Sequence, residues 1–231
     1  MSIKFTGERM VPGISSKRIE EDHLARYHFA AKYTRNKSVL DIACGTGYGT
    51  RVLLDNGAKS VDGVDNDETT IAFAKETYQA HNISYYIGDI CYFEIGIKYD
   101  VIVCFETIEH IEDYTRALMN LYNLLQEDGL LIISSPNRRI TSPKIYSFKE
   151  KPNNKYHSHE FSKTELIKIL KDNRYIINKN NVFGQRQQLL FQNNYVNKIY
   201  NKIFNPMFRS DYTVKPVVGM TPRYFVIVAE K

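Results

Sequence analysis

The stretch DIACGTGYG, residues 41–49, decides the fold of this chain. It continues the apolar run KSVLDIA (37–43), and its glycines alternate with other residues before a helix-like pattern begins. A strand that passes through a glycine turn into a helix is the opening unit of doubly wound α/β sheets. A dinucleotide fingerprint has a glycine where this chain has Asp41. A carboxylate there would repel a pyrophosphate and suits a ligand that carries an ammonium or sulfonium group.

From residue 37 onward, apolar strand-like runs alternate with helix-like patterns. Unbroken apolar runs are typical of strands that are covered on both faces. The pattern therefore predicts a doubly wound α/β fold with a seven-stranded, mostly parallel sheet and helices on both faces. The strands are expected at 37–43, 60–65, 83–89, 99–105, 129–135, 175–183 and 223–231.

The length of 231 residues, 43% of them hydrophobic, suits one domain over 1–231. We expect an N-terminal helical segment at about 16–35 and a substrate-side loop at about 136–161, where Pro, Asn and Lys accumulate. Apolar residues recur every four positions over 191–204, which predicts an amphipathic helix. This helix would pack on the sheet or a second subunit, or act as a lid, so a monomer and a homodimer both stay open.

The charge and the cysteine content limit the cellular setting and the kinds of partner that we expect. The formal net charge of +5 is a mild bias toward anionic ligands and falls short of a nucleic-acid signature. Cys44, Cys91 and Cys104 show no CxxC pairing, and the first ten residues lack the apolar core of a signal peptide. We expect a reduced, cytoplasmic setting without membrane contact, and a small-molecule partner that is anionic or polyhydroxylated.

Three successive strands end in acids. Asp41 ends the first, Asp65 the second, and Asp89 with Ile90 the third. A carboxylate at the second strand end can accept hydrogen bonds from vicinal ribose hydroxyls, and one at the third can take an adenine amine. The three acids fit one extended ligand that joins a nucleoside to an amino acid.

On these residues the chain resembles the class I S-adenosylmethionine-dependent methyltransferases, and the resemblance implies a Rossmann-like fold with an antiparallel last strand. HLARY (23–27), together with FTGERMVPG (5–13), is similar to the N-terminal region of methyltransferases found among polysaccharide and natural-product genes, where Tyr27, or else Arg26, would close over the methionine end. A nicotinamide enzyme and a fold without cofactor are the alternatives. The resemblance implies that the cofactor is S-adenosylmethionine and that it is bound by Tyr27, Asp41, Ala43, Gly45, Gly47, Asp65, Asn66, Asp89, Ile90 and Phe105.

A second motif, CFETIEHIED (104–113), follows the fourth strand. A helical turn would bring Glu106, Glu109 and His110 to one face, and the loop after the fifth strand adds His157 and His159 at the same sheet edge. Carboxylates and imidazoles without thiols suit Mn²⁺, Mg²⁺, Fe²⁺ or Co²⁺. The alternative is that these acids have no function beyond their favourable interaction with the helix dipole in a first helical turn.

The spacing ExxEH followed by HxF resembles the metal-dependent small-RNA 2′-O-methyltransferases, and ExxEH alone resembles the ubiquinone-pathway O-methyltransferases. The resemblance implies a metal site of Glu106, Glu109, His110 and His159. His110 and His157 are the candidate catalytic residues, and His157 is either a general base or a solvent-facing neighbour.

These motifs predict a methyltransferase that depends on Mn²⁺ or Mg²⁺ and methylates an oxygen of a small hydroxylated or phosphorylated acceptor, such as a sugar, a sugar nucleotide or a polysaccharide precursor. One alternative is a metal-independent N- or O-methyltransferase with His110 as base. Another is an RNA terminal ribose 2′-O-methyltransferase, although the chain lacks a basic aromatic RNA platform. The last is a non-catalytic cofactor-binding protein.

Overall fold

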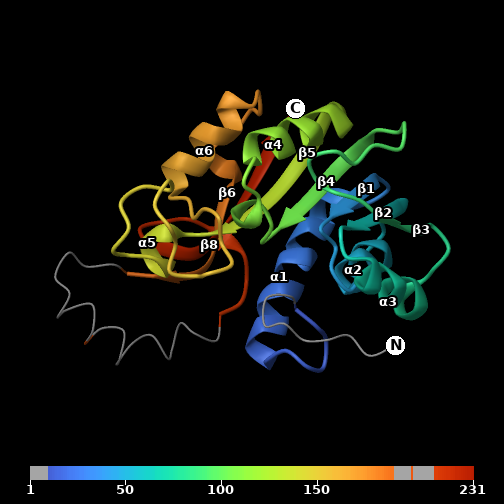
Figure 1. Ribbon diagram of the computed structural model, residues 1–231, viewed down its shortest axis with the longest axis horizontal. Helices are drawn as coiled ribbons and strands as arrows, with labels where there is room; N and C mark the ends of the chain where they lie inside the picture. Colours follow the sequence, from blue (N-terminus) through green and yellow to red (C-terminus); the bar gives the residue numbers. More distant parts are fainter. Residues whose placement is uncertain (1–9, 190–198, 200–210) are drawn as a thin grey trace.

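The computed structural model describes residues 10–189, 199 and 211–231, and the amphipathic stretch expected over 191–204 lies outside them apart from Ile199 (Figure 1). The helices are α1 (Lys17–Thr34), α2 (Tyr48–Asp55), α3 (Glu68–Tyr78), α4 (Tyr114–Leu124), α5 (Arg138–Thr141) and α6 (Lys163–Asp172), with 3-10 turns η1 (Ile108–His110) and η2 (Lys179–Asn181). The strands are β1 (Ser38–Ile42), β2 (Ser60–Asp65), β3 (Ile83–Ile87), β4 (Tyr99–Phe105), β5 (Leu125–Pro136), β6 (Val182–Gln188), β7 (Lys215–Pro216) and β8 (Thr221–Glu230).

The described strands form one sheet in the order β3-β2-β1-β4-β5-β8-β6-β7. β1 pairs in parallel with both β2 and β4, while β8 runs antiparallel to β5 and β6. The strand order reverses between β1 and β4, which is the point where open α/β sheets bind ligands. The doubly wound α/β prediction is confirmed. The sheet has eight strands in the described residues rather than seven, because the two-residue β7 also pairs with β6.

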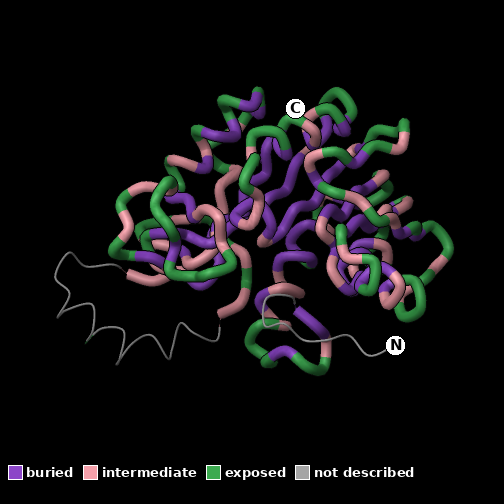
Figure 2. The backbone as a smooth tube through the Cα atoms, viewed as in Figure 1, coloured by how far each residue is buried: buried purple, intermediate pink, exposed green. Residues whose placement is uncertain are grey.

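Alternate strand residues face opposite helix layers, as the pleat requires. Leu40 and Ile42 pack in one apolar cluster with α4 and α6, whereas Val39 packs in another with α1 and α2. α3 lies beside α2 through a smaller cluster that includes Ile71. The central strands are buried along their length and the exposed segments gather in the outer loops (Figure 2). Both faces of the sheet are therefore covered, which explains the unbroken apolar strands.

The sixth strand lies further along the chain than the sequence pattern predicted. β6 begins at Val182, whereas the expected strand began at Tyr175 and shares only two residues with it. Lys179–Asn181 form a 3-10 turn, because asparagine-rich segments favour turns over strands. Ile176 makes only an isolated bridge to Glu230.

Two buried polar contacts attach α1 to the β6 end of the sheet, opposite the β3 edge. Arg186 Nε of β6 lies 2.6 Å from Asp22 Oδ1, and Arg26 Nη1 donates to Gln185 Oε1 at 2.6 Å. These contacts attach residues 22–26 of α1 to β6. None of the helices in the described part of the chain combines the length and the apolar character needed to cross a bilayer.

Candidate active site

A cavity of about 610 Å³ lies at the carboxyl ends of β1 to β4. Its walls come from these strand ends, from the inner face of α1, from η1 and from the loop that precedes α6. Its polar lining residues are His23, Tyr27, Tyr48, Asp65, Asn66, Asp89, Glu106, Thr107, Glu109, His110, Asn154, Tyr156, His157 and Tyr224.

The glycine turn after β1 forms one side of this cavity. Ala43 and Gly45 both line it and both have left-handed backbones, with φ of 57° and 56°. The Gly45 amide donates to Asp65 Oδ2 at 2.9 Å, and the Asp67 amide donates to Asp65 Oδ1 at 3.0 Å. The Asp65 carboxylate is thereby fixed at the wall, with lone pairs that can accept from ribose hydroxyls.

Asp41 lies behind the cavity wall rather than in it. Its carboxylate is buried and accepts hydrogen bonds from Tyr27 Oη at 3.0 Å and Thr50 Oγ1 at 2.7 Å. Burial raises the pKa of Asp41 to about 7. Tyr27, which lines the cavity, packs edge-on against Phe105 with ring centroids 5.2 Å apart. Asp41 and Phe105 therefore support Tyr27 from behind.

Of the other predicted cofactor residues, some line the cavity and others do not. Asn66, Asp89 and Ile90 line the cavity, and Asp89 Oδ1 accepts from the Cys91 amide at 2.7 Å. Gly47 does not line it. A Cβ at Gly47 would lie 2.8 Å from both Ala74 Cβ and Tyr85 Oη, so this glycine permits close packing between α2, α3 and β3. Arg26, the alternative to Tyr27, is also away from the cavity lining, with its guanidinium over the Tyr224 ring.

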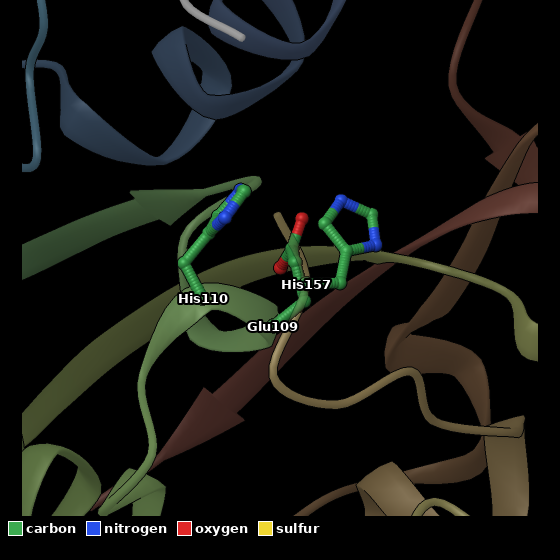
Figure 3. Close-up of side chains that lie close together, drawn as sticks. All are labelled: Glu109, His110 and His157. Atoms are coloured by element: carbon green, nitrogen blue, oxygen red, sulfur yellow. The ribbon is translucent and has the colours of Figure 1, made fainter. Parts of the chain in front are cut away.

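On the opposite side, Glu109, His110 and His157 come together. One ligand atom of each lies within 4.8 Å of the others, and this is the one such group of metal-ligating side chains among the described residues. Figure 3 shows the Glu109 carboxylate between the two imidazoles. Glu109 and His110 belong to η1, whereas His157 comes from the loop before α6.

Backbone hydrogen bonds attach this loop to η1. The amides of Ser158 and His159 both donate to the Glu109 carbonyl, at 2.8 and 3.0 Å, and Ser158 Oγ donates to the His110 carbonyl at 3.2 Å. The loop before α6 and the turn after β4 thus form one unit, although almost fifty residues separate them in sequence.

Two of the predicted metal ligands, Glu106 and His159, are not in the group. Glu106 has a left-handed backbone, with φ of 49°, and its Oε1 accepts from Ser134 Oγ at 2.7 Å. The prediction assumed an α-helical turn from Glu106, but the turn is a 3-10 turn that begins at Ile108. His159 is turned away, with its ring nitrogens 3.2 Å from the Phe148 carbonyl and 3.3 Å from the Glu112 carbonyl.

The hydrogen bonds of the two histidines assign their tautomers. His110 Nδ1 lies 3.1 Å from the Tyr156 carbonyl oxygen, which can only accept, so Nδ1 carries the hydrogen and Nε2 the lone pair. His157 Nδ1 lies 2.8 Å from Glu160 Oε1, which leaves Nε2 as the ligand atom there too. The Asn154 amide donates to His157 Nε2 at 2.8 Å and would have to turn aside for a metal.

The charged form of the Glu109 carboxylate is disfavoured in this site. It is 1% exposed, and its Oε2 has no hydrogen-bond partner among the described residues. Burial, and then the negative charge of Glu106, raise the pKa of Glu109 well above its ordinary value. A cation beside this oxygen would relieve both effects.

Sequence reasoning missed His23, Tyr48 and Glu160. Within the helical pattern of α1, His23 reads as a core position, and Tyr48 reads as part of the glycine turn. Glu160 lies inside the HxF motif, and burial would raise its pKa, but hydrogen bonds from His157 and Thr141 hold that pKa below its ordinary value. A single sequence carries no signal that separates these residues from structural ones.

Residues 17–175 match the sequence profile of a family described as "Methyltransferase domain", which is more than half of the chain. The chain belongs to the class I S-adenosylmethionine-dependent methyltransferases. A solved S-adenosylmethionine-dependent methyltransferase from Mesorhizobium loti has the same fold, with a TM-score of 0.63 at 14% identity over 91% of this chain and all of that one. The cavity of this methyltransferase lies at the switch point of the sheet, where open α/β sheets bind ligands.

Two curated relatives extend the comparison. This methyltransferase is 30% identical over 73% of its length to a probable S-adenosylmethionine-dependent methyltransferase from Mycolicibacterium smegmatis, 64% of which is covered. It is 38% identical over 45% of its length to the ubiquinone biosynthesis O-methyltransferase of Coxiella burnetii, 45% of which is covered. The chain thus covers less than two thirds of the length of these relatives.

Proposed function

We propose that this methyltransferase transfers the methyl group of S-adenosylmethionine to an oxygen of a small hydroxylated or phosphorylated acceptor, such as a sugar, a sugar nucleotide or a polysaccharide precursor, with Mn²⁺ or Mg²⁺ bound by Glu109, His110 and His157. The observation that carries the proposal is the buried Glu109 Oε2, which has no partner in the described residues and lies beside two imidazoles.

The donor set fits a divalent cation of this type. One carboxylate and two imidazoles can bind Mn²⁺ or Mg²⁺, although this donor set is less selective for one metal than a thiolate site is for zinc. Three protein ligands also leave coordination positions open. Such a cation would polarise an acceptor oxygen and hold it in place. The protein's own residues would orient the acceptor beside the cofactor. His157 would not receive the acceptor proton in this version, because its Nε2 would bind the cation and its Nδ1 hydrogen is donated to Glu160.

The charges of the cavity favour a hydroxylated acceptor over a strongly anionic one. Among the described residues, acids and imidazoles line the cavity but lysine and arginine do not. Arg138 of α5 is engaged with Glu165, at 2.7 Å, rather than available to an anion. The similarity to a ubiquinone biosynthesis O-methyltransferase supports oxygen as the acceptor atom. A lining without cations also gives no support to an RNA acceptor.

A metal-independent transfer is the second candidate, and the His157–Glu160 pair favours it. A carboxylate on Nδ1 makes an imidazole a better base at Nε2, as in hydrolytic triads. In this version His157, rather than the predicted His110, removes the acceptor proton, because the His110 Nδ1 contact is a backbone carbonyl.

Calorimetric titration of the purified full chain with Mn²⁺ tests the metal proposal without a known acceptor. We expect one Mn²⁺ per chain, and affinity losses of more than about hundredfold in Glu109→Gln and His157→Gln, because each removes a direct ligand. His159→Gln is the matched control from the same loop, and we expect its affinity to change less than about threefold. Equal losses in His157→Gln and His159→Gln would contradict the assignment.

Methyl transfer from labelled cofactor to a panel of sugars and sugar nucleotides separates the two candidates. We expect activity to disappear with EDTA and to return with Mn²⁺ or Mg²⁺. Activity that survives EDTA and is insensitive to Glu109→Gln would support the metal-independent version instead.

A further inference from the structure

A second imidazole faces the cavity from α1, away from the Glu109 group. His23 lines the cavity, and its Nδ1 lies 2.8 Å from Tyr48 Oη. Tyr48 is the first residue of α2 and is 8% exposed, and its ring packs edge-on against Tyr27 at 5.5 Å. Half-buried His23 and buried Tyr48 thus form a hydrogen-bonded pair beside the glycine turn.

The proton positions of this pair follow from its surroundings. Burial raises the pKa of Tyr48 well above its ordinary value, so the phenol keeps its hydrogen. Burial, and then the Arg26 charge, lower the pKa of His23 well below its ordinary value, so the ring is neutral. The phenol has no other hydrogen-bond partner in the part of the chain that the structure describes. Tyr48 therefore donates to Nδ1, and His23 carries its hydrogen on Nε2.

This corner is also where an anionic group meets least repulsion. The other charged lining residues in the described chain are the acids Asp65, Asp89, Glu106 and Glu109. The buried guanidinium of Arg26 lies close enough to His23 to lower the pKa of that ring, so it adds positive potential. The start of α2, at Tyr48, adds the positive end of a helix dipole.

We propose that His23 binds the carboxylate of the methionine end of S-adenosylmethionine through Nε2–H, and that Tyr48 is a positioning residue that holds the ring in this tautomer. The amino-acid end of the cofactor carries both an ammonium and a carboxylate group. The acids of the cavity can attract the ammonium group, whereas the His23 corner is the part of the described lining that suits the carboxylate. The inference concerns cofactor binding and does not rest on the metal proposal.

The test compares two ligands in calorimetric titrations of the full chain. One is S-adenosylhomocysteine, and the other is its decarboxylated analogue, which keeps the ammonium group and the adenosine. We expect His23→Leu to weaken S-adenosylhomocysteine binding about ten- to hundredfold, the range for a hydrogen bond to a charged group, and to leave the affinity for the analogue within about threefold. Tyr48→Phe should produce a smaller loss that also depends on the carboxylate, and His23→Gln should restore part of the affinity because its amide can donate.

His28→Leu is the matched control, because His28 is exposed on the same helix, and it should leave both affinities unchanged. Equal losses for the two ligands in His23→Leu, or unchanged binding of S-adenosylhomocysteine, would overturn the proposal. If His23→Leu does not fold, as judged by circular dichroism, Tyr48→Phe decides by the same criterion. Unaltered Mn²⁺ binding in these variants would show that the effect is separate from the Glu109 site.

Discussion

The two halves of the cavity are built by different means. On the glycine-turn side, which is the proposed cofactor side, the cavity-lining residues Ala43 and Gly45 lie in the turn after β1, Asp65 ends β2, and backbone amides hold Asp65 in place. On the other side, which is the proposed acceptor side, Glu109 and His157 meet only because a loop almost fifty residues further along the chain folds back onto η1. The first half is defined by local structure and the second by tertiary contacts.

This difference has a consequence for mutations. A change on the cofactor side should alter the packing of the sheet and its helices, and hence the stability of the whole domain. A change on the acceptor side should alter the orientation of a few side chains and leave the fold nearly intact. Three variants test the contrast.

The largest effect is expected from Gly47→Ala on the cofactor side. Gly47 has φ of 86°, and a Cβ there would lie 2.8 Å from Ala74 Cβ and from Tyr85 Oη. The left-handed backbone of an alanine costs about 1 kcal/mol, and overpacking costs a further 1–3 kcal/mol or so. We expect the free energy of unfolding, measured by urea denaturation, to fall by about 2–4 kcal/mol.

Gly96→Ala separates the two contributions. Gly96 also has a left-handed backbone, with φ of 75°, but nothing lies within 4 Å of the position that a Cβ would take there. This control should lose only about 1 kcal/mol. Equal losses in the two variants would mean that packing against Tyr85 is not what requires a glycine at position 47.

The same contrast explains which parts of the protein could be predicted from sequence. Asp65 and Asp89 were placed correctly at the carboxyl edge of the sheet, because an acid after an apolar strand of a parallel sheet must lie there, although β3 ends at Ile87 rather than at Asp89. The histidine beside Glu109 was not predicted correctly. The choice between His157 and His159 depends on the two consecutive amides of Ser158 and His159, which both donate to the Glu109 carbonyl. That backbone turn leaves no periodic pattern in the sequence.

Sequence reasoning also failed to identify the residues that support the cavity wall from behind. Asp41 was expected to face the cofactor, but its side chain points to the α1 and α2 side of the sheet, where Tyr27 and Thr50 bind it. Which face of a fully buried strand an acid occupies depends on register, because both faces are apolar. The position of the acid was predictable and its role was not.

Glu160→Gln should have an intermediate effect, confined to the acceptor side. Glu160 Oε1 accepts the His157 Nδ1 hydrogen at 2.8 Å, and an amide at this position can turn its nitrogen toward the ring and disturb the tautomer. We expect Mn²⁺ affinity to fall about ten- to hundredfold, with the midpoint of urea denaturation little changed. Glu150→Gln, an exposed position of the same loop, is the control. A loss of stability with unchanged Mn²⁺ binding would mean that Glu160 is structural only.

Asp41→Asn is expected to change stability only in a pH-dependent way, with no effect near pH 4. Burial raises the pKa of Asp41 from 3.8 to about 7 in the folded protein, so between these values the folded state binds a proton more tightly than the unfolded state. The stability that the protonated acid contributes is therefore present below about pH 4 and is lost as the pH rises toward 7. Asparagine resembles the protonated acid and does not titrate.

We therefore expect wild type and Asp41→Asn to have similar free energies of unfolding near pH 4, and the variant to gain at most about 1.4 kcal/mol per pH unit relative to wild type up to about pH 7. Above that pH the difference should stay constant. Urea denaturation at a series of pH values measures it, with the exposed Asp55→Asn as control. A difference that is independent of pH would mean that Asp41 is ionised throughout, and that the hydrogen bonds from Tyr27 and Thr50 outweigh the cost of burying its charge.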